Sequence, residues 1–204
     1  MVERQLRSRG IQDLRVLDAM GAIPREEFVL PDNRWRAYED GPVPIGHGQT
    51  ISQPYMAALM AQTLELTGGE TVLDVGAGSG YHAALLGRLA AEVISIEIVP
   101  PLADYARENL ARAGLDRNVV VIEGDGGLGA PEHAPFDAIS VAAGAREIPP
   151  ALIGQLNASG RLVIPIGSLD DQELRLVVKR DGRIETRVVS FCRFVPFRGR
   201  EGWR

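Results

Sequence analysis

Cysteine is nearly absent from this sequence: Cys192 is the only one among 204 residues. A single cysteine excludes an internal disulfide and is typical of a reducing compartment, and we interpret it as a small core residue. No apolar run approaches the roughly 18 residues that a membrane helix requires, and the first nine residues are too charged for a signal peptide. These absences predict a cytoplasmic protein with no membrane association.

An excess of basic residues is also missing. The net charge is −5, and the aspartates and glutamates are scattered along the chain rather than grouped. Because a nucleic-acid surface must neutralise many phosphates, we do not expect nucleic acid as a partner. One basic cluster does lie near the end of the sequence, and we interpret it as a solvated tail rather than a substrate contact. Its members are Arg193, Arg198, Arg200 and Arg204.

Histidine is scarce as well, occurring only as His47, His82 and His133. These positions lack the spacing that metal ligands have in known sites, so no metal centre is predicted. We interpret all three as structural or solvated side chains, and we expect His47 to lie nearest to a functional site.

Apolar residues are sufficient for one core, because they make up 45 % of the chain. We expect a single domain over 1–204, with 1–50 as an N-terminal helical and loop extension. For the oligomeric state we favour a monomer. The spacing of apolar residues predicts two short helices within 1–30. Residues 31–50 hold so many prolines and glycines that no regular structure is predicted there.

A helix is predicted over 54–66, with Ser52 as its N-cap and Pro54 in its first turn. After it, short β-branched runs alternate with helices. The predicted strands are 71–75, 93–97, 119–123, 137–141 and 161–165, and the predicted helices are about 81–91, 101–113 and 149–157. Near-continuous apolar strands alternating with helices predict a doubly wound, mostly parallel α/β sheet covered on both faces.

Two later β-rich runs, 174–179 and 187–195, are joined by Arg-Asp-Gly-Arg. Asp-Gly between two such runs is a strong hairpin signal. We therefore expect the sheet to end in an antiparallel C-terminal hairpin.

The sharpest local signal is Leu-Asp-Val-Gly-Ala-Gly-Ser-Gly-Tyr, residues 73–81, which follows the first core strand and opens a helix. Glycine lets the backbone approach a ligand closely, and ligands of open α/β sheets bind beyond the carboxyl ends of the strands. The dinucleotide motif G-x-G-x-x-G fails, because Tyr81 stands where its third glycine would be. The predicted cofactor contacts of this segment are Asp74, Gly76, Gly78 and Gly80.

Acidic residues follow the next two strands. Glu97 ends the second core strand, 21 residues after Gly76, where a carboxylate can accept hydrogen bonds from ribose hydroxyls. Asp125, followed by Gly126, comes after the third strand, where a carboxylate can bind an adenine amino group. Each acid alone could be a surface residue, but their occurrence at successive strand ends indicates a bound nucleoside. Without a phosphate-binding lysine motif, S-adenosylmethionine satisfies this pattern best.

The segment Pro-Ile-Gly-His-Gly-Gln-Thr-Ile-Ser-Gln-Pro-Tyr-Met, at 44–56, is far more specific than the glycine loop. Further distinctive segments lie at 124–129, 136–141, 148–156, 160–167 and 193–197. Through them nearly the whole chain resembles the protein-L-isoaspartate O-methyltransferase family. The resemblance implies a Rossmann-like domain that transfers the methyl group of S-adenosylmethionine to the α-carboxylate of L-isoaspartyl residues in damaged proteins and peptides. The ester would close to a succinimide, whose hydrolysis restores some normal aspartate.

The same resemblance assigns roles to individual residues. Ser52 would be the active-site residue, although it could instead be only the N-cap. The residues implied as further cofactor contacts are Gln49, Thr50 and Ile51. Those implied for the substrate cleft are Thr50, Ile51, Gln53 and Tyr55, with Ala142 and Ala143 as its floor and Val195, Pro196 and Phe197 as its far wall. Tyr55 and Phe197 could equally be core residues.

A carboxylate acceptor with a pKa near 4 is already ionised at pH 7, so no strong base is required. Catalysis can then rest on in-line positioning in a dry pocket. Two other functions stay open from the sequence. One is a methyltransferase of the same fold acting on a small molecule or on RNA, although the acidic charge balance disfavours RNA. The other is a non-catalytic nucleoside-binding module, against which the segments 44–56 and 193–197 argue.

Overall fold

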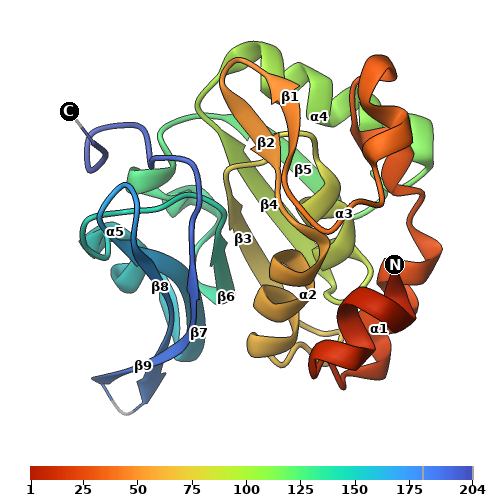
Figure 1. Ribbon diagram of the computed structural model, residues 1–204. Coiled ribbons are helices and arrows are strands. Elements are labelled where there is room, and N and C mark those ends of the chain that lie inside the picture. Colours follow the sequence, from red (N-terminus) through yellow and green to blue (C-terminus); the bar gives the residue numbers. More distant parts are fainter. Residues whose placement is uncertain (181, 204) are drawn as a thin grey trace.

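The computed structural model describes residues 1–180 and 182–203. Its core is a seven-stranded sheet in the order β5-β4-β3-β6-β7-β8-β9 (Figure 1). The strands are β3 (Thr71–Val75), β4 (Glu92–Glu97), β5 (Val119–Glu123), β6 (Phe136–Val141), β7 (Leu156–Gly167), β8 (Gln172–Arg180) and β9 (Arg183–Cys192). The first five run parallel, whereas β8 and β9 are antiparallel to their neighbours. The predicted α/β class with an antiparallel C-terminal hairpin is confirmed.

The pairing of β8 with β9 has one register shift, between Leu174 and Arg175, and it ends at Arg180 and Arg183. This leaves two residues for the connection, as Asp-Gly predicts. Of these, Asp181 lies outside the described residues, and Gly182 has a φ of +76°, which matches the left-handed conformation that tight hairpin turns require.

Helices cover the two faces of the sheet unequally. On one face α1 (Leu14–Ala22), α2 (Pro54–Thr63), α3 (Tyr81–Gly87) and α4 (Pro100–Ala113) share an apolar cluster with Val72 and Val93. The other face carries α5 (Pro150–Gly154) and a cluster that includes Leu73 and Ile94. Successive residues of β3 and β4 therefore enter different clusters, as expected for strands buried on both faces.

The order of the strands creates a switch point beside β3. From β3 the chain passes through α3 to β4 and through α4 to β5, and it then returns to place β6 on the other side of β3. The connections that follow β3 and β6 therefore diverge. This is the edge at which open α/β sheets bind ligands.

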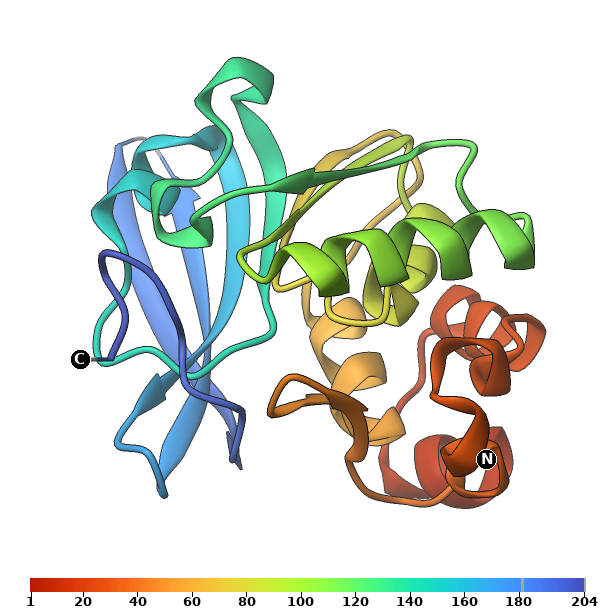
Figure 2. The same ribbon diagram turned by 90° about the horizontal axis from the view of Figure 1, so that it is seen from above.

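The N-terminal residues pack beside α2 and α3 (Figures 1 and 2). Besides α1 they form only short turns of helix: η1 (Val2–Leu6), η2 (Arg7–Arg9), η3 (Arg25–Phe28) and η4 (Pro31–Arg36). The expectation that 31–50 lacks regular structure was wrong. β1 (Val43–Gly46) and β2 (Gln49–Ile51) pair antiparallel, because the residues between them adopt positive φ and make a tight turn.

The predicted N-cap of α2 was also wrong. The helix begins at Pro54, and Gln53 is its N-cap, with no side-chain capping bond. Proline at the first helical position holds the preceding residue in an extended conformation, and Gln53 has φ −49° and ψ 136°. Ser52 therefore stands one residue outside the helix.

Candidate functional site

The glycine loop connects β3 to α3 through three left-handed residues. Gly76, Gly78 and Gly80 have φ values of +97°, +54° and +86°, which side chains with a Cβ atom rarely permit. The backbone N–H groups of Gly76 and Ala77 donate to the carbonyl of Ile96 at 2.8 and 3.1 Å. The loop is thereby held against the end of β4.

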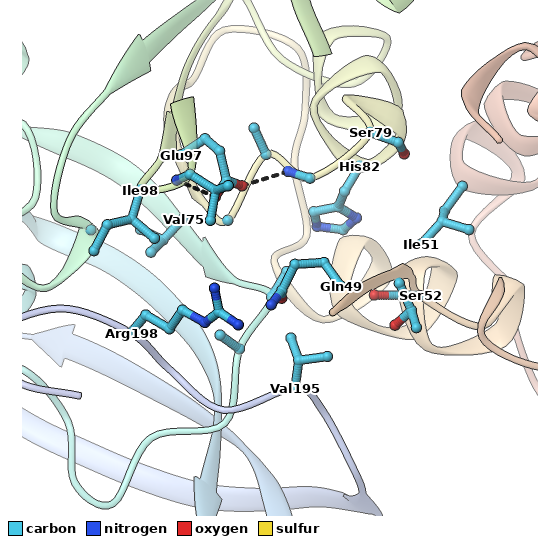
Figure 3. A pocket seen from close by; sticks show the side chains of 18 of the residues that line it. Gln49, Ile51, Ser52, Val75, Ser79, His82, Glu97, Ile98, Val195 and Arg198 are labelled. Carbon is cyan, nitrogen blue, oxygen red and sulfur yellow. Dashed lines mark hydrogen bonds between the residues drawn. The ribbon is translucent and has the colours of Figure 1, made fainter. Parts of the chain in front are cut away.

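Glu97, the last residue of β4, links this loop to the start of α4. Its Oε2 accepts from Gly78 N–H at 2.8 Å, and its Oε1 accepts from Val99 N–H at 3.0 Å (Figure 3). Only 6 % of the residue is exposed. Each carboxylate oxygen can accept a further hydrogen bond, so a fixed acceptor pair faces the space beyond the strand ends.

A pocket lies there, at the carboxyl ends of β3, β4 and β6. It brings together most predicted site residues: Gln49, Thr50, Ile51, Ser52, Gly76, Gly78, Glu97, Gly126, Ala142, Ala143, Val195, Pro196 and Phe197. The side-chain Nε2 of Gln49 is buried without a hydrogen-bond partner among the described residues (Figure 3). Buried donors are rarely left unpaired, so an unpaired donor in a pocket wall suits a polar ligand.

A second, wider cleft adjoins the pocket. It contains the predicted substrate residues Gln53 and Tyr55, and the guanidinium of Arg9 lies 3.8 Å from the centre of the Tyr55 ring. The residues that line both spaces are Thr50, Ser52, Ala142, Val195 and Pro196. Ser52 therefore lies where the two spaces meet. Tyr55 is half-buried and Phe197 is 2 % exposed, so Phe197 is both a core residue and a pocket wall.

Asp74 does not line either space. It is fully buried in β3, where Ser95 Oγ donates to its Oδ2 at 2.7 Å and its Oδ1 has no partner among the described residues. Burial raises the pKa of Asp74 to about 7, against the hydrogen bond from Ser95 and with help from the negative charge of Glu97. Gly80 does not line the pocket either, because it packs against α4, where a Cβ would lie 3.0 Å from the Ala106 carbonyl.

Asp125 is likewise outside the pocket lining, and backbone groups already occupy its carboxylate. Its Oδ1 accepts from Gly127 N–H at 2.9 Å, and its Oδ2 accepts from Arg200 N–H at 2.7 Å. Trp203 anchors the same C-terminal segment by donating its Nε1–H to the Gly144 carbonyl at 2.8 Å. Residues 197–203 therefore fold back over the strand ends.

This segment corrects the interpretation of the basic cluster as a solvated tail. Arg198 lines the pocket (Figure 3), and Arg200 binds Asp125 through its backbone. The side chain of Arg193 is 72 % exposed and pairs with Asp170 at 3.2 Å, but both residues also line the second cleft. Arg204 lies outside the described residues.

The histidine nearest to the site is His82, not His47. His47 is exposed in the turn between β1 and β2, whereas His82, on the first turn of α3, lines the pocket and is 2.8 Å from Ser140 Oγ (Figure 3). Burial lowers the pKa of His82 to about 4, so the imidazole is neutral at pH 7. Its place one residue after the glycine-loop motif was the signal in the sequence.

Other pocket residues were missed for a simpler reason. Ile98 and Val99 line the pocket directly after Glu97, so their position next to a predicted ligand contact was the available signal.

Cys192 is half-buried, packs at the edge of one apolar cluster, and has a thiol pKa raised by burial to about 11. Within 1–180 and 182–203 no three acidic, histidine or cysteine side chains are grouped to hold a metal. No helix in this part of the chain has the length and apolarity needed to cross a bilayer.

A pocket at the switch point that meets a second cleft at Ser52 suits a Rossmann-like methyltransferase. The family model described as protein-L-isoaspartate(D-aspartate) O-methyltransferase (PCMT) matches residues 1–202. A protein-L-isoaspartate O-methyltransferase of Methanoculleus marisnigri is 55 % identical over all of this chain and 92 % of its own. The chain belongs to the protein-L-isoaspartate O-methyltransferase family.

Solved structures agree with this assignment. A protein-L-isoaspartate O-methyltransferase aligns over 99 % of this chain and 67 % of its own, with a TM-score of 0.87 and 32 % identity. A Plasmodium falciparum structure of the same description, in complex with S-adenosyl-L-homocysteine, aligns over 97 % and 96 % of the two chains. Its TM-score is 0.83 and its identity is 30 %.

Proposed function

We infer that this chain transfers the methyl group of S-adenosylmethionine to the α-carboxylate of L-isoaspartyl residues in damaged proteins and peptides. Membership of the family over residues 1–202 supports the reaction, and the S-adenosyl-L-homocysteine in the Plasmodium falciparum relative supports the methyl donor. The observation that carries the proposal is the meeting of two spaces at Ser52. A donor in one space and a peptide in the other would meet at that residue.

On the donor side, Glu97 would accept hydrogen bonds from the ribose hydroxyls with the lone pairs that Gly78 and Val99 leave free. Gly76 and Gly78 would let the backbone lie close to the donor. The unpaired Nε2 of Gln49 would donate to an oxygen of the ligand. S-adenosylmethionine fits this set, because it combines a ribose, an amino acid carboxylate and no phosphate.

On the acceptor side, the isoaspartyl α-carboxylate is ionised at neutral pH and needs no base. One carboxylate oxygen forms a bond to the methyl carbon while the carbon–sulfur bond breaks, and its electron pair stays on sulfur. Two opposite charges disappear in this step. A pocket that excludes water therefore favours the reaction, because it withdraws solvation from the charged reactants.

Ser52 would orient the acceptor. Its hydroxyl makes no hydrogen bond with the described residues, whereas its carbonyl is held by Arg25. A free hydroxyl at the junction suits donation to the substrate carboxylate. The product ester then closes to a succinimide without further help, as the backbone nitrogen of the following residue attacks the ester carbonyl and methanol leaves, and hydrolysis of the succinimide yields some normal aspartate.

The substrate cleft also fits a peptide better than a nucleic acid. It presents apolar and aromatic side chains beside both charge signs, Arg9 and Arg193 with Asp170, on a chain of net charge −5. We further propose a monomeric enzyme, since one chain supplies the walls of both spaces, and a cytoplasmic one, since a single cysteine suits a reducing compartment.

The test is a pair of peptides that differ only in containing L-isoaspartate or L-aspartate, assayed with S-adenosylmethionine carrying a labelled methyl group. The isoaspartyl peptide should be methylated and the aspartyl peptide ignored. The two peptides differ in the position of one backbone methylene, which in the aspartyl peptide moves the carboxylate out of line with the methyl group. The discrimination between the two peptides should therefore exceed the ~1–3 kcal/mol that a methylene contributes in an apolar pocket. Equal rates on both peptides would favour a small-molecule methyltransferase instead.

A further inference from the structure

Arg25, the first residue of η3, is the largest fully buried side chain described, with 0 % exposure. Its Nε donates to the Ala37 carbonyl at 2.7 Å, and its Nη2 donates to the Ser52 carbonyl at 2.6 Å. Its Nη1 has no partner among the described residues. None of the ion pairs in 1–180 and 182–203 includes Arg25.

The same guanidinium lies on the ring of Tyr81, with its central carbon 4.6 Å from the ring centre. Tyr81 is the first residue of α3, immediately after the glycine loop, and it lines the pocket. Phe28 packs edge-on against the Tyr81 ring, with ring centres 5.5 Å apart. Arg25 thus touches both the segment that carries Ser52 and the helix that follows the loop.

This arrangement is costly for the stability of the fold. A buried charge without a counter-charge loses its hydration, which costs free energy unless hydrogen bonds and nearby groups compensate. Burial accordingly lowers the pKa of Arg25, although a guanidinium stays charged at neutral pH. Two carbonyls and an aromatic face are the only compensation that the described residues provide, so stability alone does not account for an arginine here.

We propose that Arg25 is a positioning residue for methyl transfer, which sets Ser52, the residue that would orient the acceptor, at a fixed distance from the donor loop. The proposal rests on the function inferred above. In-line displacement requires acceptor, methyl group and sulfur to be aligned, and a displacement of about 1 Å can lower the rate ~10²-fold. Arg25 spans the two segments that would hold donor and acceptor, yet it lines neither space.

The first variant is Arg25→Met, which keeps the length of the side chain and removes the guanidinium. We expect kcat on an isoaspartyl peptide to fall roughly 10- to 100-fold. The Kd for S-adenosylhomocysteine should change less than about threefold, because Arg25 does not contact Glu97, Gly76 or Gly78, the residues proposed to hold the donor. Arg25→Lys, which keeps the charge but not the planar fork, should recover only part of the loss.

Arg15→Met is the matched control. Arg15 also donates to two carbonyls, those of Leu66 and Leu89, but it lines neither the pocket nor the second cleft. Its removal should leave kcat within about twofold of the wild type.

The deciding experiment is a double-mutant cycle of Arg25→Met with Ser52→Ala, measured as kcat. If Arg25 acts through the Ser52 segment, its loss should matter at least fivefold less once Ser52 is alanine. Equal losses in both backgrounds, or a wild-type kcat in Arg25→Met, would overturn the proposal while the methyltransferase function stands. A wild-type enzyme inactive on the isoaspartyl peptide would instead overturn the function itself. Should Arg25→Met fail to fold by circular dichroism, the same cycle with Arg25→Lys decides.

Discussion

The carboxylate of Glu97 accepts a 2.8 Å hydrogen bond from the backbone N–H of Gly78. This bond joins the end of β4 to the glycine loop that leaves β3, so two neighbouring strands present one continuous surface. A second bond, from Val99 N–H at 3.0 Å, holds the other carboxylate oxygen. The carboxylate is therefore oriented before any ligand binds. This lowers the entropic cost of ordering the Glu97 side chain on binding.

Replacing Glu97 with alanine should weaken binding of S-adenosylhomocysteine by ~1.5–3 kcal/mol, the range for a hydrogen bond to a charged group. Calorimetry would measure it. The matched control is Glu123→Ala. Glu123 lies opposite Glu97 on the neighbouring strand β5, but its side chain forms an exposed ion pair with Arg107. The Kd of the Glu123→Ala variant for S-adenosylhomocysteine should stay within about threefold of the wild-type value. Unchanged affinity in Glu97→Ala would remove this residue from the cofactor site.

Ser52→Ala should lower kcat/KM by roughly ten- to a few hundred-fold, the loss of ~1.5–3 kcal/mol of transition-state stabilisation. Stability should hardly change, because Gln53 and not Ser52 caps α2. If Ser52 were the N-cap, its replacement by alanine would instead lower the free energy of unfolding by ~0.5–2 kcal/mol. Denaturant unfolding and steady-state kinetics on the same variant separate the two roles. Full activity with reduced stability would make Ser52 a structural residue.

The raised pKa of Asp74, about 7, predicts that the folded state binds a proton more tightly than the unfolded state, whose pKa is about 4. The free energy of unfolding should therefore fall as pH rises from about 4 to 7. Asp74→Asn, which resembles the protonated acid, should remove this penalty, up to ~4 kcal/mol above pH 7. Urea unfolding at pH 5 and pH 8 measures it, and an equal effect at both values would refute the assignment.

His82 should act in the opposite direction. Its pKa of about 4 lies below the unfolded value of about 6.5, so the unfolded state binds a proton first as pH falls. Stability from this group is complete above about pH 6.5 and is lost on going down to about 4. His82→Gln should flatten that part of the unfolding profile. A variant with the wild-type slope between pH 4 and 6.5 would contradict the lowered pKa of His82.

Gly199→Ala should disturb the C-terminal segment. Gly199 has a φ of +114°, and a Cβ there would clash with the Asp125 carboxylate that also accepts from Arg200. We expect weaker binding of S-adenosylhomocysteine by about threefold or more, since the adjacent Arg198 lines the pocket. Gly10→Ala is the control, with a φ of +92° but open space at the added atom. Equal affinities in both variants would contradict a role for this segment.

The architecture could be predicted because it depends on local patterns. Apolar runs of four to six residues separated by helices indicate a parallel sheet. Six of the seven expected strands lie within β3–β8, and the seventh, 187–195, runs three residues past the end of β9 at Cys192. The glycine loop and Glu97 were found for the same reason. Strand ends of a parallel sheet meet at one edge, so a motif and its place in the order of elements are enough to locate a ligand site.

Tertiary packing alone decided which side chains reach that site. Asp74 lies inside β3 and is fully buried, whereas Gly76, just beyond the end of the strand, lines the pocket. The C-terminal segment covered Asp125, and α3 brought His82 to the pocket wall in place of His47. Arg25 of η3 contacts both Ser52, which lies between β2 and α2, and Tyr81 of α3. No periodicity encodes such contacts, because they depend on how loops and helices far apart in the sequence pack together once the sheet has formed.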